Sequence, residues 1–202
     1  MKKVISYCCI VMIVLSSSCK RQALRPYDYV KYIKSQESGL QRAVHVDGWE
    51  YDITYKPAEY ILLTEAKGDR SFDQNKRERE LRGTAWFNIS FKRADGQVSP
   101  LRYNAGTLDE YNRRLDYFLN HASGNIYLIY GTDTLKPMSY LFETNYNLAP
   151  QETMVVGFSL PGNEERPSKN MELKYYDDIF RNGVIKTTYP AETLNDIPKL
   201  IL

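Results

Sequence analysis

Alternation of large apolar and polar side chains constrains this chain more than any other feature of its sequence. Every second residue is apolar in two segments, at Trp49, Tyr51, Ile53 and Tyr55 and again at Ala85, Phe87, Ile89 and Phe91. A period of two residues is that of a β-strand with one buried face. Asp47-Gly48 precedes the first segment, which predicts a hairpin with residues 43–46 as the partner strand.

Shorter apolar runs separated by turn residues predict further strands. They cover residues 126–130, 138–143, 154–160, 171–176 and 184–189. The chain thus has about eight short strands and no regular alternation of strands with helices, a pattern that argues against a parallel sheet. We therefore expect a mainly β protein: an antiparallel β-sandwich, immunoglobulin- or transthyretin-like, with one or two helical insertions.

One helix has a clear start signal. Thr107 and Glu110 have the spacing of a capping box, and apolar residues follow at helical spacing before Ser123-Gly124. We expect this helix to lie on a sheet or across its open end, with Arg114 among the residues on its solvent face. Shorter helices are predicted at 27–34 and 58–67. Residues 69–83 hold nine charged residues in fifteen, which indicates a solvated helix or a mobile loop.

The N-terminus has the organisation of an export signal. Lys2 and Lys3 precede an apolar run from Val4 to Leu15, and three serines and Cys19 follow it. As a helix the apolar run would span only about 18 Å, which is short of a hydrocarbon core of about 30 Å. We therefore expect residues 1–18 to be a signal peptide that is removed.

The segment Leu15-Ser16-Ser17-Ser18-Cys19 resembles the lipobox of bacterial lipoproteins. Its leucine lies four residues before the cysteine instead of the usual three, as in relaxed boxes of the Bacteroidetes type. The resemblance implies that the Cys19 thiol and the new N-terminus receive fatty acyl chains such as palmitate. Because Cys8 and Cys9 lie within the signal peptide, the mature chain would keep no other cysteine and no disulfide.

The resemblance also implies a location. In lipoproteins of this type an acidic stretch after the cysteine accompanies export to the cell surface, and here that stretch is basic, Lys20-Arg21-Gln22-Ala23. We therefore expect a lipid anchor in the outer membrane that faces the periplasm. Residues 19–26 would form the tether, and residues 27–202 a single β-rich domain. The mature chain has 25 basic and 25 acidic residues, a balance that argues against nucleic acid as a partner.

Catalytic signals are weak in this sequence. The two histidines, His45 and His121, have ordinary explanations in a strand and at a helix end, and no metal-binding, phosphate-loop or nucleophile-elbow motif is present. We predict no catalytic residue, no metal and no cofactor. A hydrolase that uses two carboxylates stays open as an alternative. Its candidate acids are Asp133, Glu143, Asp177 and Asp178.

Aromatic residues supply the remaining candidates for a binding site. Trp49 and Trp86 suit either sheet packing or a platform for sugar rings, and Tyr140, Phe142, Tyr146 and Leu148 surround an expected loop. The first hypothesis is a non-enzymatic adaptor or scaffold that binds another envelope protein, such as a subunit of a secretion or transport assembly. A glycan-binding lipoprotein is the main alternative.

Overall fold

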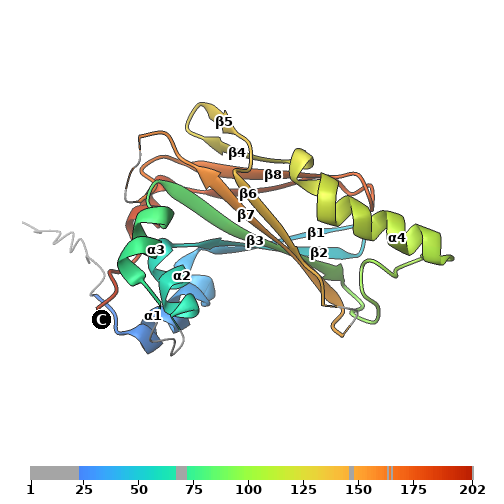
Figure 1. Cartoon of the computed structure of the whole chain (residues 1–202), viewed down its shortest axis with the longest axis horizontal. Helices are drawn as coiled ribbons and strands as arrows, with labels where there is room; N and C mark the ends of the chain where they lie inside the picture. Colours follow the sequence, from blue (N-terminus) through green and yellow to red (C-terminus); the bar gives the residue numbers. More distant parts are fainter. Residues whose placement is uncertain (1–22, 67–71, 146–147, 163, 165, 202) are drawn as a thin grey trace, which may run out of the picture.

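The computed structural model describes residues 23–66, 72–145, 148–162, 164 and 166–201, and shows two antiparallel sheets packed into a sandwich (Figure 1). One sheet has the strand order β1 (Gln41–Val46), β2 (Trp49–Lys56), β3 (Thr84–Arg93), β7 (Gln151–Ser159) and β6 (Ser139–Glu143). The other has the order β5 (Asp133–Leu135), β4 (Ile126–Tyr130), β8 (Met171–Asp177) and β9 (Gly183–Tyr189). The expected β-sandwich is therefore confirmed.

The alternating segments become the centre of the five-stranded sheet. All four apolar residues of β2 are buried, and β3 repeats the pattern, so each strand has one face in the core. Asp47 and Gly48 have φ of 46° and 75°, and these left-handed conformations are those of the type I′ turn that joins β1 to β2. Strand β5 was not expected: it begins at Asp133, the last residue of a segment, 131–133, that reads as a polar turn.

Aromatic rings fill the space between the two sheets. Tyr189 of β9 packs 5.5 Å from Phe87 of β3, and its hydroxyl donates to the Ile53 carbonyl at 2.8 Å. Tyr51 of β2 faces Tyr175 of β8 with a ring separation of 6.4 Å. Tyrosine suits this core where its ring adds buried area and its hydroxyl finds a partner, as it does at Tyr189 and at Tyr51, whose hydroxyl donates to Asp177.

Three helices gather at one end of the long axis and a fourth lies at the other (Figure 1). The first group is α1 (Pro26–Ile33), α2 (Ala58–Glu65) and α3 (Gln74–Leu81). Helices α2 and α3 cover Trp86 on the outer face of the five-stranded sheet, where Ile61, Leu62 and Leu81 form a second, smaller core. Within the charged segment, residues 74–81 thus form a helix whose start is capped by Asp73. Two 3-10 turns, Gln36–Ser38 and Ala122–Asn125, complete the connections.

Helix α4 (Leu108–Asp116) starts at the expected capping box and continues as a π-helical turn, Tyr117–His121. Three residues depart from the expected orientation. Leu108 and Leu119 belong to the apolar residues at helical spacing that were expected on the buried side, but they are 71% and 47% exposed. Arg114, expected on the solvent face, turns inward to donate to the carbonyls of Pro100 and Tyr103. The helix extends beyond the ends of the strands (Figure 1), and none of its residues is fully buried, although Tyr111 and Leu115 pack against the core.

Both ends of the described chain meet beside α1. The Leu24 amide donates to the Lys199 carbonyl at 2.8 Å, and the Ile201 amide donates to the Leu24 carbonyl at 2.8 Å. The last helix, α5 (Ala191–Asn195), precedes this contact. Ordered structure thus begins at least two residues before α1, within the expected tether. Among the described residues no helix combines the length and the apolarity needed to cross a bilayer.

Candidate functional site

Strand β6 forms one edge of the five-stranded sheet and carries exposed apolar side chains. It pairs with β7 on one side, and no described strand pairs with its other side. Leu141 is 57% exposed and lies opposite Val155 of β7 on the outer face, and Met138, just before the strand, is 52% exposed. An edge with free backbone groups and uncovered apolar side chains is a surface on which another chain can pair.

A polar groove crosses the middle of the same outer face. The hollow has a volume of about 320 Å³, and its floor is the outward side of β2 and β3. The end of α1 and Tyr60 of α2 form one wall. The polar side chains that line it are Lys34, Gln41, Asp52, Thr54, Lys56, Asn88, Ser90 and Gln151.

Burial perturbs the groups in this groove. Desolvation, and then the negative charge of Glu50, raise the pKa of Asp52. Desolvation lowers the pKa of Lys56. The Asn88 Oδ1 atom is buried without a hydrogen-bond partner, whereas Ser90 and Thr153 bond to each other at 2.9 Å. The groove can therefore exchange hydrogen bonds with a polar ligand, and Asn88 offers an acceptor for it.

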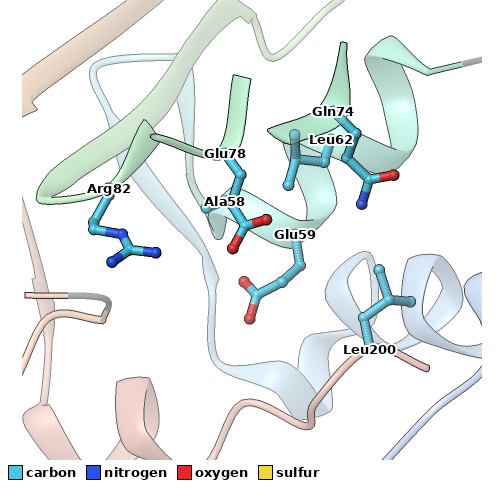
Figure 2. A pocket seen from close by; sticks show the side chains of 7 residues that line it. All are labelled: Ala58, Glu59, Leu62, Gln74, Glu78, Arg82 and Leu200. Atoms are coloured by element: carbon cyan, nitrogen blue, oxygen red, sulfur yellow. The ribbon is translucent and has the colours of Figure 1, made fainter. Parts of the chain in front are cut away.

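A smaller hollow lies between α2, α3 and the C-terminal segment. Figure 2 shows Glu59 and Glu78 reaching into it, with Arg82 at its edge and Leu200 on the opposite side. Its volume is about 170 Å³, below the range of about 300–1,000 Å³ that is usual for ligand pockets. Glu59 is 2.5 Å from Arg166 Nη2, and the same guanidinium donates to the Ile197 carbonyl. These contacts tie the C-terminal segment to α2.

The two tryptophans are not free platforms. Trp49 is buried between Phe180, whose ring stacks at 3.9 Å, and Tyr103, and the Arg93 guanidinium lies 5.3 Å from its ring. Trp86 is half-buried beneath α2 and α3, and its indole Nε1 donates to Thr84. Both residues support the sheets on which the candidate surfaces lie.

The residues predicted around the loop after β6 separate into two groups. Phe142 stacks on Phe118 at 5.2 Å in the core, and the Tyr140 hydroxyl donates to the Phe118 carbonyl, so both hold β6 against the π-helical turn. Leu148 is 90% exposed. Tyr146 and Cys19 lie outside the described residues.

The four acids considered for a hydrolase do not converge. Asp177 is buried and accepts hydrogen bonds from Tyr51 and Asn182, and the adjacent Asp178 accepts one from Asn125. Asp133 lies on β5, and Glu143 ends β6 in the other sheet. In the described ranges no group of three acids, histidines or cysteines could hold a metal ion.

Comparison with protein-family models, with curated proteins and with solved structures finds no match for this chain. Sequence reasoning missed the groove, although its polar residues were visible as the outward positions of the two alternating segments. The sequence does not show that α1 and α2 pack beside one side of that face, where they form the wall of the hollow.

Proposed function

We propose that this protein is a lipid-anchored adaptor of the bacterial cell envelope, which binds a partner protein along the β6 edge. The single observation that carries the proposal is the uncovered apolar edge at Met138 and Leu141. An extended segment of the partner would pair its backbone with β6, and its side chains would cover these two residues. Acylation at Cys19 would hold the protein on the periplasmic face of the outer membrane, since two or more acyl chains anchor stably.

In-cell photocrosslinking tests the docking surface. A benzophenone amino acid replaces Leu141 in the full-length lipoprotein, or Thr188, which is exposed on the outer face of the other sheet. We expect a discrete protein adduct at position 141 and none at 188, because only the β6 edge is proposed to meet the partner. Adding Met138→Glu should lower the adduct yield several-fold. Equal adducts at both positions, or none at 141, would contradict the proposal.

A second candidate function is glycan binding in the polar groove, favoured by the buried, unpartnered Asn88 Oδ1. Sugars present many hydroxyl donors, which such a groove of carboxyl, amide and hydroxyl groups can accept. Two variants, Asn88→Ala and Leu141→Glu, distinguish the adaptor function from glycan binding. Under the adaptor proposal Asn88→Ala leaves the adduct at position 141 unchanged, whereas under the glycan alternative it abolishes retention on envelope polysaccharide and Leu141→Glu does not.

A further inference from the structure

We propose that the exposed side of α1 is the membrane-contact face of this protein and lies on the anionic headgroups of the leaflet that holds its anchor. The face consists of Tyr27, Lys31 and Lys34, with Arg25 just before the helix. This inference rests on the proposed acylation of Cys19 and adds an orientation for the domain.

The contact between the chain ends fixes where the tether enters the domain. The N–H and the C=O of Leu24 are both hydrogen-bonded to the segment 199–201, and α1 begins two residues later. Five peptide steps separate Leu24 from Cys19. At no more than about 3.6 Å per residue they span at most about 18 Å. An acylated Cys19 therefore keeps Leu24, two residues before the start of α1, within that distance of the membrane interface.

Helical periodicity divides α1 into a buried side and an exposed side. Tyr29 and Ile33 are buried in the main core, and they lie four residues apart on one side. Tyr27, which is 79% exposed, and the exposed Lys31 and Lys34 recur at spacings of four and three residues on another side. A tyrosine among lysines is typical of a surface at the membrane interface, where the ring meets the headgroup level and the amines meet phosphates.

The excess of basic residues in the mature chain also lies next to the proposed anchor. Residues 20–34 contain five basic residues and one acid, Asp28, whereas residues 35–202 contain twenty basic and twenty-four acidic residues. Basic residues near an anionic leaflet are attracted to it, and this attraction falls off within the Debye length. The overall balance of charge thus conceals a basic segment next to the anchor. The exposed Glu37 lies in the 3-10 turn that follows α1 and contacts it.

Spin labelling of the acylated protein in vesicles tests the orientation. Tyr27→Cys in α1 and Leu108→Cys in α4 each introduce a cysteine for a nitroxide, at positions that are 79% and 71% exposed. The two helices lie at opposite ends of the long axis (Figure 1). The vesicles contain phosphatidylglycerol and phosphatidylethanolamine. We expect collisions of the label at position 27 with a water-soluble nickel complex to fall several-fold relative to those at 108. Equal accessibility at the two positions would overturn the inference.

Charge reversal tests which residues hold the face on the membrane. Lys31→Glu with Lys34→Glu should restore the nickel accessibility of position 27, whereas the matched pair Arg113→Glu with Lys136→Glu, two exposed cations outside α1, should not. Protection that survives reversal of Lys31 and Lys34 would also overturn the inference. Labelling of the parent chain separates a failure of the anchor from a failure of the orientation, because an acylated Cys19 takes up no nitroxide and a free one does.

Discussion

Glu152 and Asp177 are both buried acids, but their surroundings differ. Asp177 accepts hydrogen bonds from Tyr51, from Asn182 and from the Phe180 amide, and so fixes the turn between β8 and β9. Glu152 accepts a hydrogen bond on Oε1 from the Ser99 hydroxyl at 2.7 Å, and its Oε2 atom is buried without a partner. Burial raises the pKa of Glu152, which favours its protonated form in the folded protein.

This difference predicts a pH dependence of stability. Because the folded protein holds the Glu152 proton to higher pH than the unfolded chain, the contribution of Glu152 is complete below the unfolded pKa of about 4.3 and declines as pH rises through the folded pKa. Glu152→Gln cannot ionise. We expect its free energy of unfolding in urea to exceed that of the parent by about 1 kcal/mol at pH 8, with a smaller difference at pH 5.

The exposed Glu143→Gln serves as the control, and its unfolding free energy should follow that of the parent at both pH values. A Glu152→Gln variant that loses stability between pH 5 and pH 8 as steeply as the parent would contradict the assignment.

At the scale of elements, α2 and α3 are held on the sheet through Trp86 and Gly157. The two residues are paired across β3 and β7, and the indole lies directly over the glycine. A Cβ atom built on Gly157 would lie 2.9 Å from two ring carbons. The absence of a side chain at this position therefore lets the ring lie flat beneath the helices.

We expect Gly157→Ala to displace the Trp86 ring and to loosen the packing of α2 and α3. The cost should be about 1–3 kcal/mol, as for other insertions into well-packed sites. Chemical unfolding monitored by tryptophan fluorescence measures it. Gly124→Ala is the matched control, because no heavy atom lies within 4 Å of the added Cβ there. Equal stabilities of the two variants would show that the ring is not constrained at Gly157.

The elements also show how far the sequence predicts this fold. The long alternating segments were sufficient for β2 and β3, since burial of one face leaves a direct record in the residue types. Strand β5 and helix α5 were not predicted, because three and five residues hold too few repeats of a period. The exposure of Leu108 depends on how far α4 extends past the strands, which local periodicity does not encode.

For the candidate surfaces, prediction from the sequence failed for a different reason. The segment around Tyr140 and Leu148 was singled out by its composition, but composition did not distinguish the exposed Leu141 and Leu148 from the buried Phe142. That distinction follows from the register of β6 against β7, which places Leu141 outward and Phe142 in the core. The pairing of β6 with β7, the next strand along the chain, decided it.

At the scale of the whole molecule, the contact of Leu24 with residues 199–201 joins the tether to the sandwich. Deletion of residues 199–202 should free the Leu24 amide, whose hydrogen bond ends on the Lys199 carbonyl. We expect hydrogen exchange at Leu24 to accelerate by at least tenfold in the shortened chain, while exchange at Ile89 in the central strand β3 stays unchanged. Slow exchange at Leu24 after the deletion would mean that other contacts hold this segment.

The same contact determines how mechanical force would enter the domain. Under the anchored arrangement, tension between the membrane and a bound partner reaches the first ordered residues at Leu24, where two backbone hydrogen bonds to residues 199–201 resist it. Rupture of these hydrogen bonds would lengthen the segment between the membrane and the domain before the force reaches the sheets. The contact of Leu24 with residues 199–201 would then break before the sheets do, and so would protect the sandwich from unfolding under force.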